Sequence, residues 1–222
     1  MKIVCRDLFP PFELFSNKIN ILAMENNKAF YRFILMLYDM INGAAGDIVL
    51  SHNNVPLKLS AKAELITSFV PFEMNSRKLI TKLHNHLADI SVNEVFYEKT
   101  QRLIAGIVEY LYDVCSYDNF ETEFNEDISI TSLFKCADIK LYDKHDSLIA
   151  KIIDYMLNIT ELEGEKLFIT VNFLTYIDKK ERELFYNTVI DHQLCVLLIE
   201  PAAHDKHEKI NQLIIDEDFC VI

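Results

Sequence analysis

Glycine and proline are scarce in this chain of 222 residues, which contains four Gly and five Pro. So few turn-forming residues argue against a chain built from many tight hairpins. Half of the residues are hydrophobic, a composition that excludes a disordered, collagen-like or low-complexity protein and predicts a compact core. The length suits one large domain or two smaller ones.

Long apolar runs and paired cysteines are missing as well. No stretch reaches the roughly 18 uninterrupted apolar residues that span a bilayer. The start, Met1 to Asp7, is charged and has no signal-peptide core. The five cysteines are widely spaced without a CxxC pair, so we expect reduced thiols and neither a disulfide framework nor a zinc site. The sequence therefore predicts a cytoplasmic protein that does not enter a membrane.

Nucleotide-binding and catalytic motifs are also absent. Neither GxGxxG nor GxxxxGK[ST] occurs, and no Ser, Cys or Thr lies in a nucleophile motif. The turn that follows the first predicted strand, Ala23 to Lys28, has no glycine and carries the Glu25 carboxylate where a phosphate would bind. We therefore expect no ATP hydrolysis.

Charge is distributed unevenly along the chain, whose formal net charge is −12. Residues 1–102 carry 12 basic and 10 acidic side chains, whereas residues 103–134 carry seven acidic side chains and no basic one. Acidic proteins repel nucleic acid on average. A basic segment can still attract phosphate when the acidic side chains lie in another segment. The acidic and the basic segments are therefore considered separately.

The hydrophobic pattern predicts an α/β fold. Apolar side chains recur at helical spacing or in short continuous runs. The predicted helices are 25–41, 76–87, 93–117, 128–136, 146–158 and 179–191, and the predicted strands are 19–23, 47–50, 166–171 and 194–199. Two apolar strands joined by the helix 179–191 are typical of a buried parallel β-α-β unit. We predict a head domain with a largely parallel sheet and flanking helices, formed by residues 1–59 and 146–222, and a helical domain over 60–145.

Five carboxylates lie within ten residues in the middle of the chain: Asp118, Glu121, Glu123, Glu126 and Asp127. Repulsion in so dense a cluster weakens folding unless the carboxylates are solvated or a cation lies among them. Oxygen ligands of this kind suit Ca²⁺, although the spacing does not match an EF-hand loop. A solvated acidic loop and a structural Ca²⁺ site both fit the sequence.

Basic side chains are concentrated between residues 58 and 82: Lys58, Lys62, Arg77, Lys78 and Lys82. Lys78 and Lys82 are one helical turn apart and project from one helix face beside Arg77. One such patch would bind few phosphates, whereas symmetric copies would multiply the interactions. A solvated helix face explains the same residues equally well.

Several segments together resemble a known family. They are FEMNS at 72–76, the stretch from Glu121 into ISITSLFK at 128–135, EKLFITVN at 165–172, YIDK at 176–179, VLLIEP at 196–201 and IDEDF at 215–219. In this order and spacing the chain resembles the short form of the Csn-two family. This family is the accessory protein of type II-A CRISPR loci that takes part in spacer acquisition.

The resemblance implies more than the residues alone indicate. It implies an α/β head of P-loop type without nucleotide motifs, an elongated all-helical leg, and a homotetrameric ring around double-stranded DNA. Such a ring binds free DNA ends, slides inward and has no known catalytic activity. The resemblance assigns the acidic cluster to the family's Ca²⁺ region and the five basic residues to the inner surface of the ring. It also implies cooperation with the CRISPR integrase and effector nuclease.

Two other functions fit the same residues. One is a nucleotide-free, P-loop-like scaffold that binds proteins and not DNA. The other is a metal-dependent nuclease that uses the acidic cluster. The local clustering of the carboxylates, without a nearby Lys or His, disfavours the nuclease.

Overall fold

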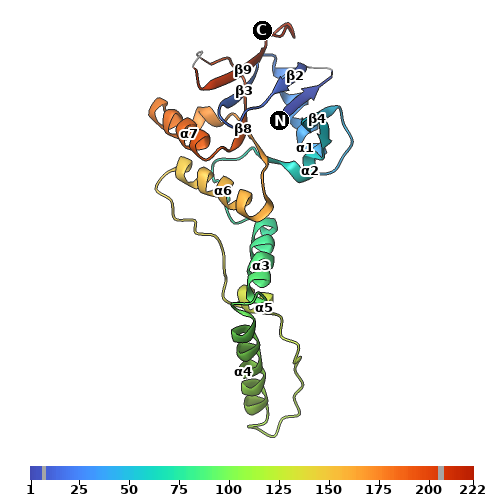
Figure 1. Ribbon diagram of the computed structural model, residues 1–222, viewed down its shortest axis with the longest axis vertical. Helices are drawn as coiled ribbons and strands as arrows, with labels where there is room; N and C mark the ends of the chain where they lie inside the picture. Colours follow the sequence, from blue (N-terminus) through green and yellow to red (C-terminus); the bar gives the residue numbers. More distant parts are fainter. Residues whose placement is uncertain (7–8, 205–207) are drawn as a thin grey trace. The chain divides into compact units, whose positions relative to one another are not determined.

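The computed structural model describes residues 1–6, 9–204 and 208–222. Its contacts divide the chain into two compact units (Figure 1). Unit 1 consists of Met1–Glu73 and His145–Ile222, and unit 2 consists of Met74–Lys144. Among the described residues, no helix is long and apolar enough to cross a membrane.

A parallel sheet forms the centre of unit 1. In the described residues its strand order is β6-β7-β8-β3-β9, and all its strand pairs are parallel. The strands are β3 (Ile19–Met24), β6 (Ala63–Ile66), β7 (Leu167–Val171), β8 (Cys195–Glu200) and β9 (Ile210–Ile215). Every residue of β3, β7 and β8 is buried. Strands covered by helices on both faces are expected to be apolar throughout. Because β7 and β8 pair in parallel, the predicted β-α-β unit is confirmed.

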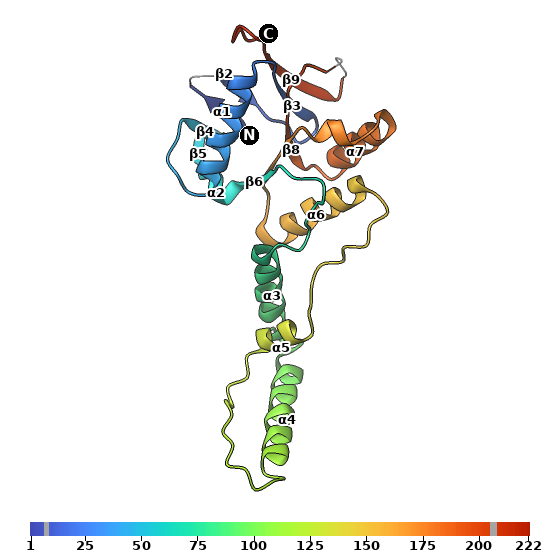
Figure 2. The same ribbon diagram turned by 180° about the vertical axis from the view of Figure 1, so that it is seen from behind.

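Helices cover both faces of this sheet. They are α1 (Asn27–Ile41), α2 (Leu59–Lys62), α6 (Leu148–Glu163), α7 (Lys179–Asp191) and the short 3-10 helix η1 (Phe173–Tyr176). Phe33 and Leu37 of α1 belong to the same core as alternate residues of β7 and β8. Both views place α7 on the side of the sheet opposite α1 (Figures 1 and 2). Asp178 and Glu181 form a capping box that fixes the start of α7.

A second, antiparallel sheet in unit 1 has the order β2-β1-β4-β5 in the described residues. Its strands are β1 (Lys2–Cys5), β2 (Phe9–Glu13), β4 (Ile48–His52) and β5 (Val55–Leu57). Pro10 and Pro11 lie in β2, at the edge of the sheet, where a missing N–H is tolerated. Asn53 and Asn54, with positive φ, form the turn between β4 and β5.

Unit 2 contains three helices in its 71 described residues, Met74–Lys144: α3 (Arg77–Ser91), α4 (Tyr97–Cys115) and α5 (Ile130–Cys136). Hydrogen bonds hold the segment that follows α5 against the first part of unit 2, which contains α3. The buried His84 bonds through Nε2 to the Ile139 carbonyl (2.8 Å). Asn75 donates to the Leu141 carbonyl (3.0 Å) and accepts from the Leu141 N–H (2.9 Å). Residues 118–129 and 139–144 have no regular secondary structure, so the elements of this unit are helices joined by irregular segments.

The boundary of the helical part differs from the expected residues 60–145. Residues 63–66 form β6, which pairs with β7 in the parallel sheet of unit 1. Phe72 also belongs to unit 1, where its ring packs edge-on against Tyr155 of α6 with centroids 5.1 Å apart. The division therefore falls at Glu73/Met74 and Lys144/His145.

A buried ion-pair network ties α6 to the sheet. Lys166, only 3% exposed, lies 2.6 Å from the Glu163 carboxylate and 4.0 Å from that of Glu64. The Tyr155 hydroxyl donates to Glu64 (2.9 Å). Removing Lys166 leaves the half-buried carboxylates of Glu64 and Glu163 without compensation, which is more costly than losing a surface ion pair.

We predict that Lys166→Ala lowers the free energy of unfolding by about 3 kcal/mol, because it leaves the half-buried carboxylates of Glu64 and Glu163 unpaired. Urea denaturation at pH 7 measures this change. Lys179→Ala is the control, since Lys179 is exposed at the start of α7, and its effect should stay within about 0.5 kcal/mol. Equal effects of the two substitutions would contradict a structural role for the network.

Candidate nucleic-acid interface

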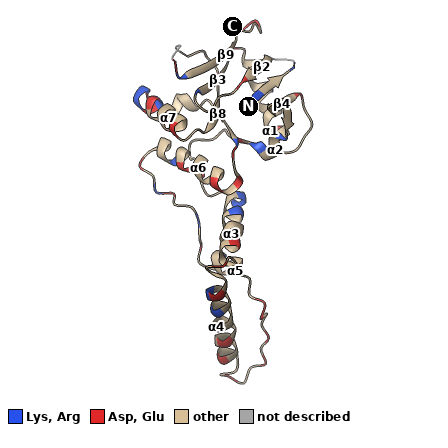
Figure 3. Ribbon diagram, viewed as in Figure 1, with Lys and Arg blue, Asp and Glu red and all other residues tan. Residues whose placement is uncertain are grey.

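Three of the predicted DNA-binding residues, Arg77, Lys78 and Lys82, lie in the first two turns of α3 (Figure 3). The Ser76 hydroxyl caps this helix by accepting from the Leu79 N–H (3.3 Å). The first turn of α3, which is fully described, contains no acidic residue. Cations are unfavourable near the positive end of a helix dipole. Arg77 and Lys78, in the first turn, therefore do not serve the stability of the helix, and the basic start of α3 (Arg77, Lys78 and Lys82) has the charge that attracts phosphate.

Lys58 and Lys62 belong to unit 1, unlike the other three predicted residues. Lys58 is the N-cap of the short helix α2, and Lys62 is its last residue. Lys58 is exposed and Lys62 is half-buried. The structure thus groups the five basic residues as two and three, and a single surface containing all five stays a prediction.

The acidic segment (residues 118–127) has no regular secondary structure, and all five of its predicted metal ligands are exposed. Two contacts fasten it to α4. The Tyr112 hydroxyl donates to the Glu126 carboxylate while the Tyr112 and Phe124 rings pack edge-on, with centroids 4.9 Å apart, and the Thr122 hydroxyl donates to the Cys115 carbonyl (3.4 Å). The Asp127 N–H is taken by the Asn125 side chain (3.0 Å). The segment behaves as a solvated acidic loop, one of the two structures that its sequence allowed.

The carboxylates of the acidic segment are of the right chemical kind for Ca²⁺, but their arrangement does not fit a calcium site in the single chain. Among the described residues, no three His, Cys, Asp or Glu side chains come together as metal ligands. Glu126 is directed to Tyr112. Ca²⁺ needs six to eight oxygen ligands around one point. The expected ligand set of Asp118, Glu121, Glu123, Glu126 and Asp127 is therefore not assembled here.

One face of α4 lacks cover. Thr100 is the sole buried residue of this helix, which the structure describes throughout. Leu103, Tyr110 and Val114 are 52%, 65% and 52% exposed. Together with Gly106 and Ile107 they recur at positions three and four apart, and so form one apolar stripe. Nothing lies within 4 Å of the place where a Cβ of Gly106 would be.

The turn between β3 and α1 has the position of a phosphate-binding loop but is already filled by the chain's own groups. The Asn26 side chain accepts from the N–H groups of Lys28 (3.0 Å) and Ala29 (3.1 Å), which are the amides that a phosphate would use. Asn26 also donates to the Glu217 carbonyl (2.8 Å). The turn without glycine therefore uses its own Asn26 side chain, in place of a phosphate, as the acceptor for these amides.

Glu200 is a buried carboxylate at the end of β8, beside Ala23 of β3. It is 2% exposed and accepts from the Leu174 N–H (3.1 Å), at the start of η1. Burial raises the pKa of Glu200 to about 7, although the hydrogen bond from Leu174 and the charge of Arg182 oppose this shift. Its position indicates that the carboxyl caps η1 inside the fold.

Comparison with known proteins decides the family. The family model described as CRISPR-associated protein (Cas_Csn2) matches residues 37–219. The chain belongs to the Cas_Csn2 family. The resemblance to the Csn-two family is thereby confirmed, and the basic start of α3 and the acidic segment both lie within the matched part of this Cas_Csn2 protein.

The fold of this Cas_Csn2 protein is similar to a solved structure described as Stu0660 of Streptococcus thermophilus. The TM-score is 0.59 at 15% sequence identity, over 97% of this chain and 75% of the other. A putative ABC transporter ATP-binding protein from Pyrococcus furiosus aligns with a TM-score of 0.41 and 11% identity, over 96% of this chain and 97% of the other. A score this low does not indicate a shared fold. No curated protein sequence matches this chain.

Sequence reasoning missed the contacts that give these segments their shape. The Tyr112–Glu126 bond joins residues 14 apart across an irregular stretch. The Asn75 and His84 bonds reach residues 66 and 55 positions away. On α4, apolar residues recur three and four positions apart. This spacing is the sequence signal that one face of the helix requires a partner.

We predict that Glu126→Gln lowers the pKa of Tyr112 toward 10, its ordinary value. In the structure the hydrogen bond to the Glu126 carboxylate raises that pKa above 10.0, because the phenolate would lose the bond and face a negative charge. An NMR titration of protein with ¹³C-labelled tyrosine measures it, and Tyr112→Phe assigns the signal. Glu121→Gln, with the same charge change nearby, should leave it unchanged. An unaltered Tyr112 titration in Glu126→Gln would disprove the contact.

Glu200 gives a prediction about pH. Its folded pKa of about 7 lies above the ordinary value of 4.5, so the folded state holds this proton more tightly than the unfolded state does. The contribution is fully present below about pH 4.5 and is lost as the pH rises through 7. We expect stability to fall over this range by at most about 3 kcal/mol.

Urea denaturation at pH 5 and pH 8 measures this dependence. Glu200→Gln should remove the decline that Glu200 causes, because the amide stays neutral at both values. Asp191→Asn, at the end of α7, is a control that keeps the decline. A decline of the same size in Glu200→Gln and in the unmodified chain would contradict the assignment.

Proposed function

We propose that this Cas_Csn2 protein is a non-enzymatic accessory factor of CRISPR spacer acquisition. In this proposal four copies form a ring that binds the ends of double-stranded DNA without sequence specificity and slides along the duplex. The CRISPR integrase and effector nuclease are its expected partners. Membership of the family, matched over residues 37–219, is the observation that carries the proposal.

Electrostatics supports DNA as the ligand despite the net charge of −12. The basic start of α3 adds three cations to the positive end of a helix. Phosphate contacts made in this way need no recognition helix, because they carry no sequence information. The seven acidic side chains of residues 103–134 lie outside α3. The cations that would attract DNA and the excess of carboxylates therefore lie in different segments of the chain.

The apolar stripe of α4 supports assembly from several copies. A glycine inside a helix costs about 1 kcal/mol relative to alanine, and nothing around Gly106 in the single chain requires one. Gly106 would allow a second helix to approach closely. Lys99 precedes Gly106 by seven residues and Asp113 follows it by seven. Two antiparallel copies of α4 crossing at Gly106 would therefore bring each Lys99 beside the Asp113 of the other copy.

Ca²⁺ binding is proposed for the assembled protein and not for the single chain. Its supports are the family resemblance and the oxygen ligands of the acidic segment. DNA binding by the basic start of α3 does not depend on it.

We predict that Arg77→Gln/Lys78→Gln weakens binding to linear duplex DNA by about tenfold or more at low salt. Each phosphate contact that is lost should reduce the slope of log affinity against log salt by about 0.9. Gel shifts over a range of salt concentrations measure both quantities. Lys179→Gln/Lys180→Gln is a matched control, because it removes two cations from the same positions of α7.

Linear and relaxed closed circular forms of one plasmid test the ring. A ring loads from an end, so the unmodified protein should bind the linear form and not the circle. Equal binding to both forms would contradict threading. Unchanged DNA binding by Arg77→Gln/Lys78→Gln would contradict the assignment of these residues, and no DNA binding at low salt would favour the scaffold. Cleavage with Mg²⁺ that is lost in Glu123→Gln would favour the nuclease.

A further inference from the structure

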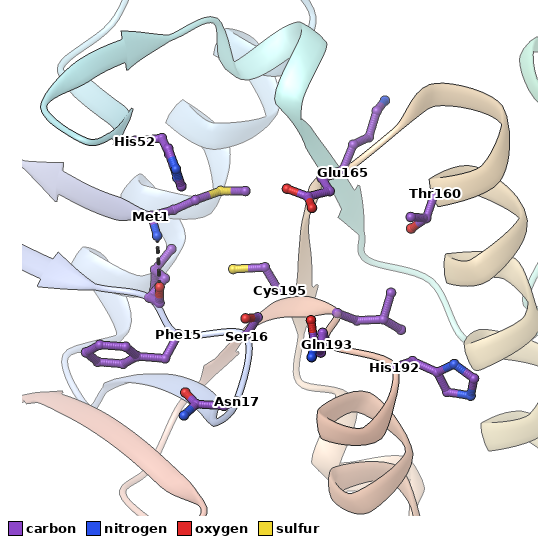
Figure 4. Close-up of a pocket in the computed structure, with 13 residues that line it drawn as sticks. Met1, Phe15, Ser16, Asn17, His52, Thr160, Glu165, His192, Gln193 and Cys195 are labelled. Carbon is purple, nitrogen blue, oxygen red and sulfur yellow. Dashed lines mark hydrogen bonds between the residues drawn. The ribbon is translucent and has the colours of Figure 1, made fainter.

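Unit 1 contains a cavity of about 390 Å³ at the amino ends of the parallel strands (Figure 4). Its walls come from the segments that precede β3, β7 and β8, from β4 through His52, and from α6 through Thr160. The turn at Asn26 lies at the carboxyl ends of the strands, which is the opposite edge of the sheet. This amino-edge cavity is therefore separate from the phosphate-loop position and uses none of the predicted DNA-binding residues.

Negative charge converges on the amino-edge cavity. Helices α6 and α7 both end at this edge, and neither has a basic residue in its last turn. Each helix end presents carbonyl groups with a partial negative charge. Glu165, between α6 and β7, adds a full charge, and Figure 4 shows its carboxylate directed toward the space bordered by Met1 and Cys195.

The wall of the cavity contains two cations, of which Lys166 is paired with carboxylates and the Met1 amino group keeps its positive charge beside Cys195. Lys166 is held by the carboxylates of Glu163 and Glu64, at 2.6 and 4.0 Å. The amino group of Met1 donates to the Leu14 carbonyl (2.9 Å), which Figure 4 draws as a dashed line. Glu165 therefore remains as the negative group of the lining to which the structure assigns no ion pair among the described residues. The Leu14 carbonyl at this edge already accepts from an ammonium, that of Met1.

The remaining wall is mixed, because Ser16, Asn17, His52, Thr160, His192 and Gln193 line it beside apolar residues. Leu14, Leu194 and Met1 contribute apolar surface. Burial raises the pKa of the Cys195 thiol to about 11, so this group stays neutral and adds a soft, polarizable surface. Metal chemistry does not fit, because no three metal ligands come together among the residues described.

We propose that the amino-edge cavity binds the side chain of an arginine or lysine presented by a partner protein. The apolar part of the wall suits the aliphatic stem of such a side chain, and the cationic head lies toward Glu165 and the carboxyl ends of α6 and α7. Long basic side chains combine these two properties. The site is a protein-docking site, independent of the proposed DNA-binding surface.

The test uses N-acetyl-arginine N-methylamide as the probe and the citrulline compound as its neutral isostere. Amide chemical shifts of ¹⁵N-labelled full-length protein at pH 8 report binding at Leu194 and Cys195. We expect the arginine probe to shift these signals with an affinity at least tenfold higher than that of the citrulline probe. Equal affinities, or no shifts with the arginine probe at 100 mM, would overturn the proposal.

Glu165→Gln should weaken the arginine probe at least fivefold. Glu217→Gln, which makes the same change at the opposite edge of the sheet, should leave its affinity unchanged. The amide spectrum of each variant shows whether it is folded. If Glu165→Gln and Glu217→Gln bind the arginine probe with equal affinity, Glu165 does not contribute to the site and the proposal is overturned.

DNA binding is measured on the same variants. Glu165→Gln should bind DNA normally, and Arg77→Gln/Lys78→Gln should bind the arginine probe normally. Failure of the docking site is thus distinguishable from failure of the DNA-binding proposal. Loss of probe binding in Arg77→Gln/Lys78→Gln would contradict the independence of the two sites.

Discussion

The need to bury apolar surface constrains the two units of this protein differently. Unit 1 meets it internally, because helices cover a parallel sheet whose strands β3, β7 and β8 are buried throughout. Unit 2 does not meet it along α4, where the stripe from Leu103 to Val114 is exposed and Thr100 alone is buried. An uncovered stripe of this kind marks an interaction surface. The proposed ring depends on copies of the chain covering it.

The distribution of charge is consistent with the same proposed assembly. A helix gains nothing from cations at its first two positions, yet α3 begins with Arg77 and Lys78. The acidic segment is exposed and held by Tyr112. Because attraction and repulsion lie in different segments, an acidic protein is compatible with a ligand as negative as duplex DNA.

The sequence predicted the elements whose signal is local. The buried strands β7 and β8 and the capped helix between them were predicted, since continuous apolar runs and helical spacing are read directly. Strands β1, β2, β5, β6 and β9 were missed: β2 contains Pro10 and Pro11, and β1, β5 and β6 are only three or four residues long. Their pairing is decided by tertiary partners. The kinds of residue at the candidate site were predictable for the same reason, whereas the Tyr112–Glu126 bond and the separation of Lys58 from Arg77 depend on the fold.

The mass of the protein in solution tests the central claim, that the uncovered face of α4 brings copies of this chain together. Sedimentation equilibrium with and without Ca²⁺ measures it directly, and Gly106→Leu, which blocks the close approach of a second helix, is the matched comparison. The account predicts a mass near four times 25.9 kDa for the unmodified chain, and a smaller mass for the variant. A single species of 25.9 kDa at all concentrations, with Ca²⁺ present, would contradict it.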